Sequence, residues 1–500
     1  MHDLYKPLRN KLRKQSVFES LVTAFRFMQF MDYDIPLEGK LAPPMLMGRI
    51  DRMRQGIVQW EFEILIREIV LNGNKFSKNH LDSWSEVARQ INAIKRIENE
   101  SWGQHKSQDD DILYELVRIA HRQFPWQRGL NQSHYARYHR LYSADGLSQI
   151  IERDYGMTTS ELFQITLALT GHFLSNVALK LPMQNELNNV SSEVCEAFIR
   201  KFAISIDSLR EKYSSHASYD INWAYTFNPL RQTPLVYLPG NRSLMCPIPH
   251  FLARRVTNEL YFDLVTNADA FALHFGPAVQ AMVGAVAKAA NVSGSFKLRH
   301  EMRYGSKKSP KDTADWIISD NSAHLFVESK GARVKFRGTS DLRSHTFIDA
   351  EFIRIKGFAF QLYKTLSAAL CGEYPNWKPD GRPVYPIVVT LEDWQTFGLH
   401  VQRLVFDPLA HELAAIGIDP DITKRHPLSF CSIEDFELAM IAADTVGIDK
   451  IFSRKNEGEY PQWSLGTFVS QNFSEELGNR KPTAFLEEWD YITPPRRNPT

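Results

Sequence analysis

Residues 312–330 constrain this chain more than any other stretch. Two short apolar runs, 316–318 and 325–327, flank a polar segment at 319–323 that is rich in turn-forming Ser, Asp and Asn. Apolar runs on either side of such a segment are typical of a β-hairpin, in which the polar residues form the turn. The sequence therefore predicts two antiparallel strands joined at 319–323.

The position of the turn sets which residues of the two strands face each other. A turn centred in the polar segment places Asp315 opposite Glu328 and Ile317 opposite Phe326. Side chains alternate along a strand, so Glu328 and Lys330 share a face. Asp315, Glu328 and Lys330 are therefore expected to converge.

Two facing carboxylates repel each other and require positive charge nearby. A hard divalent cation, Mg²⁺ or Mn²⁺, takes oxygen ligands and keeps several waters. Asp315, Glu328, the backbone carbonyl of Ser329 and a substrate phosphate would complete its shell. Lys330 could orient a water molecule and stabilise charge developing on the phosphate. The chemistry indicated is hydrolysis of a phosphodiester bond.

These residues resemble the PD-(D/E)xK, or restriction-endonuclease-like, nuclease superfamily. Asp315 matches the first acid of its pattern, Glu328 the second and Lys330 the lysine, with Ser329 as the variable residue. Ala314 stands where the family name has proline. The resemblance implies an Mg²⁺-dependent nuclease that hydrolyses nucleic acid; DNA is the favoured substrate and RNA stays an open alternative.

The resemblance extends over about residues 230–400. A helix at 271–286 matches the family's helix before the hairpin, with Gln280 where an acid is expected, and this replacement weakens the case for a second metal. A helix beginning at residue 355 carries Gln361, which matches a glutamine that often faces the site. A strand at 384–391 follows. Gln280 and Gln361 are expected to support the catalytic groups rather than to bind metal.

Two other interpretations of such residues need to be weighed. The segment with Glu38 and Lys40 has the same Glu-x-Lys spacing, but nearby prolines argue against paired strands, so it is set aside. The hairpin at 312–330 could also be an edge hairpin with solvated charges. Agreement between its spacing, apolar runs and turn favours the catalytic interpretation.

Basic residues gather around the proposed site. The chain has a net charge of +1, whereas residues 297–343 contain eleven Lys or Arg against six Asp or Glu. A basic cluster by itself is usually a solvated surface, but beside a phosphodiesterase site it predicts attraction of phosphate. The predicted nucleic-acid-binding residues are Arg303, Lys307, Lys308, Arg333 and Lys335.

The 500 residues suggest more than one domain. Apolar residues recur at helical spacing in the first two hundred residues, which predicts a helical sensing or partner-binding domain over 1–220. A hairpin pattern at 234–247 opens the second domain, predicted over 221–490. Its order of helix, hairpin, helix and strand indicates an α/β fold, and the resemblance implies a restriction-endonuclease-like fold with a central mixed sheet.

The remaining features concern location and partners. The four cysteines are widely spaced, the first residues lack the apolar core of a signal peptide, and residues 162–179 are expected to form a buried helix rather than a membrane span, so a cytoplasmic protein is predicted. The expected partner is nucleic acid, with DNA favoured. Two further partners stay open: a second copy of the chain in a homodimer, and a protein trigger that acts through the helical domain. The architecture resembles standalone bacterial anti-phage effectors. The alternative is a catalytically degenerate nuclease fold that only binds nucleic acid or protein.

Overall fold

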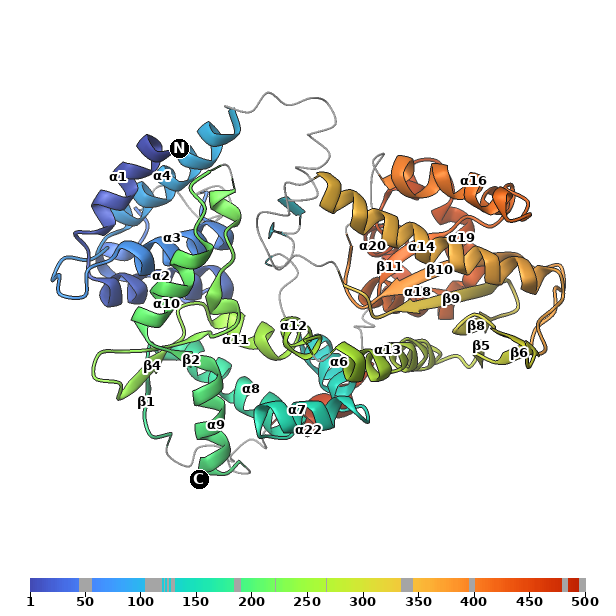
Figure 1. Ribbon diagram of the computed structural model, residues 1–500, viewed down its shortest axis with the longest axis horizontal. Helices are drawn as coiled ribbons and strands as arrows, with labels where there is room; N and C mark the ends of the chain where they lie inside the picture. Colours follow the sequence, from blue (N-terminus) through green and yellow to red (C-terminus); the bar gives the residue numbers. More distant parts are fainter. Residues whose placement is uncertain are drawn as a thin grey trace. The chain divides into compact units, whose positions relative to one another are not determined.

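The computed structural model describes residues 1–44, 56–103, 119–120, 122–123, 126, 131–183, 190–220, 222–266, 268–333, 345–394, 401–478 and 484–493. Helices and mixed β-sheets make up the chain (Figure 1). It divides into two compact units. The first contains Met1–Ala268, Arg337–Arg343 and Glu487–Thr500, and the second contains Asp269–Phe336 and Ser344–Leu486.

The first unit is mostly helical, as the sequence predicts. Side chains at the starts of several helices accept backbone N–H groups, and Thr158 forms a capping box with Glu161. The helices are α1 (His2–Leu12), α2 (Val17–Tyr33), α3 (Gln59–Asn72), α4 (Trp84–Gly103), α6 (Gln132–Tyr142), α7 (Leu147–Tyr155), α8 (Thr159–Ser175), α9 (Ser192–Phe202), α10 (Ile206–His216), α11 (Pro249–Val256) and α12 (Leu260–Leu264). Short 3-10 turns occur at Gly39–Leu41, Trp223–Tyr225 and Pro229–Arg231, and α22 (Leu486–Ile492) lies near the C-terminus.

A buried polar network centred on Glu68 of α3 ties the helices of the first unit together. Tyr5 of α1 donates a hydrogen bond to the Glu68 carboxylate at 2.7 Å, and the Trp223 indole donates at 3.1 Å. Arg67 pairs with the same carboxylate at 2.9 Å and also donates to the Trp223 carbonyl at 2.7 Å. Because its polar groups find partners, this network fixes three distant segments of chain at low cost.

A small sheet in the first unit explains why the two units divide at a higher residue number than the sequence suggests. The predicted hairpin at 234–247 exists as β3 (Leu235–Tyr237) and β4 (Ser243–Met245). However, β4 pairs with β1 (Leu179–Lys180) and β3 pairs with β2 (Ala203–Ile204), in the order β1-β4-β3-β2. These pairings join the hairpin to elements from the first 220 residues, so the contacts divide the chain at residue 268, whereas the sequence suggested 220.

A five-stranded mixed sheet forms the centre of the second unit. Its order is β11-β10-β9-β8-β5, with β5, β8 and β9 antiparallel and β9, β10 and β11 parallel. The predicted strand at 384–391 is β10. The strands are β5 (Lys297–His300), β8 (Trp316–Ser319), β9 (His324–Lys330), β10 (Val384–Thr390) and β11 (Ser429–Ser432).

The predicted hairpin and its register are confirmed. Strands β8 and β9 pair with Ile317 opposite Phe326 and Trp316 opposite Val327. The turn is held by Asp320, whose carboxylate accepts the backbone N–H groups of Ser322 at 2.7 Å and Ala323 at 2.8 Å. A short polar side chain that bonds backbone two residues on is the turn chemistry expected of Asp.

Helices cover both faces of this sheet, and both predicted flanking helices are present. The face with Ile317 and Phe326 packs against α14 (His345–Leu370), which Figure 1 shows lying across the strands. The opposite face carries Trp316, which meets α13 (Ala268–Ala290) at Gly284. Strands β9 and β10 are buried along almost their whole length, as expected of strands covered on both sides.

The remaining helices of the second unit follow β10 in the chain. They are a π-helical turn at Gln402–Phe406, α16 (Asp407–Ala415), α17 (Ile422–Arg425), α18 (Ile433–Val446), α19 (Ile448–Lys455), a 3-10 turn at Tyr460–Gln462, α20 (Leu465–Asn472) and α21 (Ser474–Leu477). A separate two-stranded sheet is formed by β6 (Arg303–Ser306) and β7 (Ser309–Asp312).

One helix of the described chain is long and apolar enough to cross a membrane. It is α13, whose segment Asp269–Ala290 has a mean hydropathy of 1.4. A core helix of a globular protein meets the same test, and α13 packs Phe275 and Val279 close to Gly331 at the end of β9. Segment 162–179 contributes to α8, whose residues Leu162, Phe163, Ile165 and Leu169 are buried.

We expect Gly284→Ala to lower the free energy of unfolding by about 1–3 kcal/mol through overpacking. A Cβ at this position would lie 2.1 Å from the Trp316 ring, so α13 or the indole must move. Gly276 on the same helix is the matched control because nothing lies within 4 Å of its Cβ position. Gly276→Ala should be neutral or stabilise by up to about 1 kcal/mol. Calorimetric melting of both variants tests the packing; equal effects would contradict it.

Candidate active site

Three carboxylates form one row at the ends of neighbouring strands β5, β8 and β9: Glu301 follows β5, Asp315 precedes β8, and Glu328 lies near the end of β9. The register of β8 and β9 continues to Asp315 opposite Glu328. On the other side, the Glu301 N–H donates to the Asp315 carbonyl at 2.9 Å, which places Glu301 opposite Asp315. Directly opposed residues project from the same face. Asp315 and Glu328 therefore share the face of Ile317 and Phe326, which α14 covers, whereas the Glu301 carboxylate contacts Gln280 of α13.

A β-bulge next to this row directs the chain out of the sheet. Glu301 bonds to Asp315, but the next residue, Met302, already accepts the N–H of Thr313 at 3.1 Å. Ala314 is thus one residue extra, and its N–H donates to the Tyr374 hydroxyl at 3.0 Å instead. Bulges bend a strand and re-aim the neighbouring side chains, and they are frequent beside active sites. Here the bulge immediately precedes Asp315.

Lys330 reaches the carboxylates from the same strand as Glu328. Its Nζ atom donates to Glu328 Oε1 at 2.6 Å and lies 3.4 Å from Gln361 Oε1 on α14. The ammonium group also lies 5.5 Å from the centre of the Phe358 ring. The structure therefore brings Asp315, Glu328, Lys330 and Gln361 together, in the arrangement that the sequence predicts.

Burial and like charge change the acidity of Asp315. Its pKa rises from 3.8 to about 7, because burial disfavours the anion and because the Glu328 carboxylate, and to a lesser degree Glu301, repels it. The Ser329 N–H, which donates to Asp315 Oδ2 at 2.6 Å, and the charge of Lys330 oppose this rise. One lysine thus leaves the carboxylate row short of positive charge.

The donor set fits a hard cation held by few protein ligands. The N–H and C=O of a strand residue point to the same side, so the Ser329 carbonyl faces the side on which its N–H meets Asp315. Asp315, Glu328 and this carbonyl are all oxygen donors. In the part of the chain that the structure describes, no three His, Cys, Asp or Glu side chains form a metal-binding group. Mg²⁺ needs no such cage, because it commonly binds through one or two carboxylates and retains waters.

Glu301 is the residue that the sequence analysis missed. The side chain of Gln280 on α13 donates to Glu301 Oε2 at 3.1 Å, so the predicted glutamine contacts the carboxylate row through Glu301. The Gln280 carbonyl accepts the Trp316 indole N–H at 2.8 Å, which fixes α13 against β8. Alternation along β5 could have indicated Glu301, but the bulge and β6–β7 separate it from Asp315 in sequence.

Arg333, which the sequence predicts to bind nucleic acid, is buried and paired in the structure. It is 6% exposed and its guanidinium pairs with Glu392, which follows β10, at 2.9 Å through Nε. An arginine held in this way has its charge neutralised inside the unit. Arg303, Lys307 and Lys308, which the sequence also predicts to bind nucleic acid, are exposed, and Arg303 pairs with Asp312 at 3.0 Å. Lys335 lies outside the described residues.

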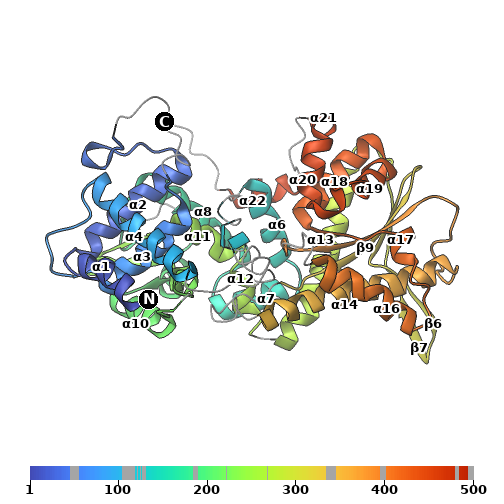
Figure 2. The same ribbon diagram turned by 90° about the horizontal axis from the view of Figure 1, so that it is seen from above.

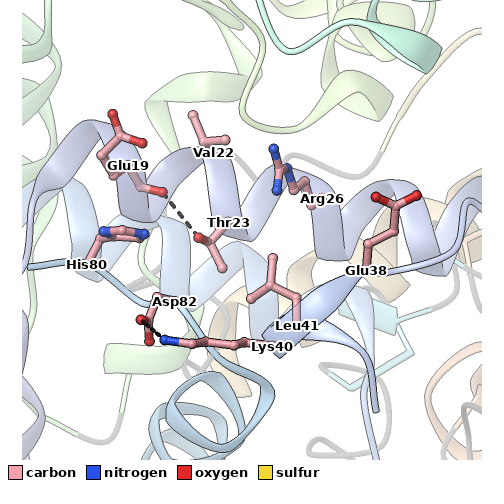
Figure 3. Close-up of a pocket in the computed structure, with 9 residues that line it drawn as sticks. All are labelled: Glu19, Val22, Thr23, Arg26, Glu38, Lys40, Leu41, His80 and Asp82. Carbon is pink, nitrogen blue, oxygen red and sulfur yellow. Dashed lines mark hydrogen bonds and ion pairs between the residues drawn. The ribbon is translucent and has the colours of Figure 1, made fainter.

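A polar pocket of about 390 Å³ occurs in the first unit (Figure 3). Lys40 and Asp82 form an ion pair across it at 3.4 Å. Lys40 lies in the 3-10 turn Gly39–Leu41 and Glu38 directly precedes it, so this Glu-x-Lys segment does not form paired strands, as the sequence predicts. The pocket is lined by Glu19, Val22, Thr23, Arg26, Glu38, Lys40, Leu41, His80 and Asp82. Side chains of both signs line it, so its charge does not select anions or cations.

The raised pKa of Asp315 predicts how the free energy of unfolding of the metal-free protein, measured in EDTA, changes with pH. The folded state holds this proton more tightly than the unfolded chain, so the free energy of unfolding falls as pH rises from about 4 to about 7. Asp315→Asn removes the charge and keeps an oxygen for the Ser329 N–H. The variant should therefore be more stable than wild type at pH 8, on the order of 1–2 kcal/mol after allowing for partial exposure.

The measurement is urea-induced unfolding at pH 8 and pH 4 in EDTA. The advantage should disappear at pH 4, where the wild-type carboxyl is protonated in the folded state. Asp490→Asn, at an exposed position, is the control and should show no such dependence. An Asp315→Asn variant that is equally destabilised at both pH values would show that the carboxyl does not titrate as described.

The chain was also compared with known proteins. It matches no protein-family model, no curated protein sequence and no solved structure.

Proposed function

We propose that this chain is an Mg²⁺- or Mn²⁺-dependent nuclease of PD-(D/E)xK type, with a restriction-endonuclease-like fold, that hydrolyses phosphodiester bonds in DNA. The observation that carries the proposal is the convergence of Asp315, Glu328 and Lys330 at the end of one hairpin. The facing carboxylates repel each other, and the raised pKa of Asp315 means that its ionised form is costly to stability. A cation that binds between them would remove this cost, which supports a site built for function.

Each side chain has a distinct part in such a reaction. Asp315, Glu328 and the Ser329 carbonyl would hold the metal, which when bound supplies positive charge to the phosphate and makes water more acidic. Lys330, held by Glu328 and Gln361, can donate a hydrogen bond to a phosphate oxygen and stabilise the charge that develops there. Water adds to phosphorus and one ester P–O bond breaks, which yields a phosphate monoester and an alcohol.

Two glutamines and Glu301 would support these groups. Gln361 is within 3.4 Å of the Lys330 ammonium and limits where that group can point. Gln280 orients Glu301, which borders Asp315 and adds negative charge to the row. Groups that orient ligands in this way typically affect activity by about 10–100-fold. From the combination of a helical unit with the second unit, we propose that the chain acts as a cytoplasmic anti-phage effector that is triggered through the helical unit.

We expect Asp315→Ala, Glu328→Ala and Lys330→Ala each to reduce cleavage by at least about 10²–10³-fold, because each removes either a metal ligand or the ammonium group that stabilises charge in the transition state. Gln361→Ala and Gln280→Ala should reduce it by about 10–100-fold. The assay incubates purified protein with plasmid DNA, single-stranded DNA and RNA in Mg²⁺, Mn²⁺ or EDTA. Circular dichroism and thermal melting check that the variants fold.

Glu457→Ala and Lys450→Ala are matched controls, because both residues are exposed in the second unit. They should cut like wild type. Near-normal, metal-dependent cleavage by all three active-site variants would overturn the proposal. A wild-type protein that binds nucleic acid but cuts nothing in any metal would instead favour a degenerate nuclease fold that acts as a binding module.

A further inference from the structure

Strands β6 and β7 form a ribbon that leaves the main sheet beside the carboxylate row. The four ladder pairs run from Arg303 opposite Asp312 to Ser306 opposite Ser309. Every residue of the two strands is exposed except Tyr304, which is half-buried. Figure 2 shows the ribbon extending beyond the neighbouring helices of its unit. A two-stranded ribbon is marginally stable on its own in water, so this one must be supported elsewhere.

The support is confined to the base of the ribbon. The Tyr304 ring packs on the Tyr374 ring at 5.5 Å between centres, and Lys311 pairs with Glu373 at 2.9 Å. The Tyr374 hydroxyl also accepts the N–H of Ala314 in the bulge. The ribbon is therefore anchored to the loop after α14, while its outer half is exposed on both faces.

Unpaired positive charge lies only at the tip. The ten residues 303–312 contain four Lys or Arg and one Asp. Arg303 and Lys311 have acidic partners, whereas Lys307 and Lys308, in the two-residue turn, form no ion pair with any residue that the structure describes. The two free ammonium groups at the exposed tip attract phosphate. The base of the ribbon is nearly neutral, because its basic residues are paired with acids.

We propose that the β6–β7 ribbon enters the major groove of duplex DNA and that Lys307 and Lys308 hold backbone phosphates there. The inference rests on the proposed nuclease function and names its substrate as double-stranded DNA. The major groove of B-DNA, about 12 Å wide, admits a two-stranded β-ribbon. The major groove of duplex RNA is too narrow for this, and a single strand has no groove.

The length of the ribbon sets the distance between the cleaved phosphodiester bond and the DNA that the tip of the ribbon contacts. Six residues separate Glu301 in the carboxylate row from the tip at Lys307, which at about 3.3 Å per residue is a reach of roughly 20 Å. At about 3.4 Å per base pair, this equals roughly six base pairs. The contact with DNA should therefore extend on one side of the cut by about that length.

The test compares Lys307→Ser/Lys308→Ser with Lys288→Ser/Lys450→Ser, which removes the same charge from exposed positions on α13 and α19. Both are made in a Glu328→Ala background so that nothing is cut. Fluorescence anisotropy is measured over a salt series with duplex DNA, single-stranded DNA and duplex RNA. The tip variant should bind duplex DNA at least about 10-fold more weakly, with the salt slope reduced by about 2, and should bind the other two as before.

The control variant should bind duplex DNA like the parent. An equal loss on single strands and duplex would overturn the groove contact, because it would show general charge attraction. The inference would also be overturned if the tip variant bound duplex DNA as tightly as the parent, or if the parent did not bind duplex DNA. Binding is measured without cleavage, so these outcomes are separate from the nuclease proposal: single-strand cleavage that needs metal would keep that proposal while the ribbon inference fails.

A second measurement uses the reach of the ribbon. Catalytically intact protein is given duplexes shortened base pair by base pair on either side of the cleavage position. Cleavage by the parent should fall when one arm becomes shorter than about six base pairs. The tip variant should cut long duplexes more slowly than the parent, and its cleavage rate should not depend on the length of that arm. An identical length dependence in both proteins would overturn the inference.

Discussion

The pairing of β8 with β9 is the constraint on which the second unit depends. Side chains alternate along a strand, so a slip of one residue would move every side chain of β8 to the opposite face. Ile317 and Phe326 would then leave the core beneath α14, and Asp315 would no longer face Glu328. The core therefore selects the register, and the register places the acidic groups. Packing several residues away determines the geometry of the site.

The same register imposes an electrostatic cost. Asp315 and Glu328 are held close by backbone pairing that they cannot adjust, and the row continues to Glu301. The Ser329 N–H and the Lys330 ammonium offset part of the repulsion, yet the pKa of Asp315 remains raised. Strain of this kind persists where surrounding structure over-determines it, and such positions cluster at functional sites.

Local features of the sequence predicted the parts of the site that local chemistry determines. The turn at Asp320, the alternation around Ile317 and the helices that carry Gln280 and Gln361 each depend on neighbouring residues, and all are present. The position of the polar turn segment was enough to predict the register of β8 and β9.

Contacts between distant segments could not be predicted in the same way. Arg333 is neutralised by Glu392, 59 residues later, and no local pattern indicates that pair. Glu301 joins the row only because one extra residue at Ala314 interrupts the ladder between them. The hairpin of β3 and β4 belongs to the first unit because of strand partners far upstream.

The bulge at Ala314 has a consequence for how such a chain could diversify. Beyond it, the ribbon has a ladder of its own, so insertions there leave the registers of β5, β8 and β9 untouched. One added residue per strand would lengthen the ribbon by about 3.4 Å and turn its tip face over, whereas two per strand would restore the face. Variation in length would thus be tolerated in increments of about 7 Å, without any change to the strands that carry the carboxylates.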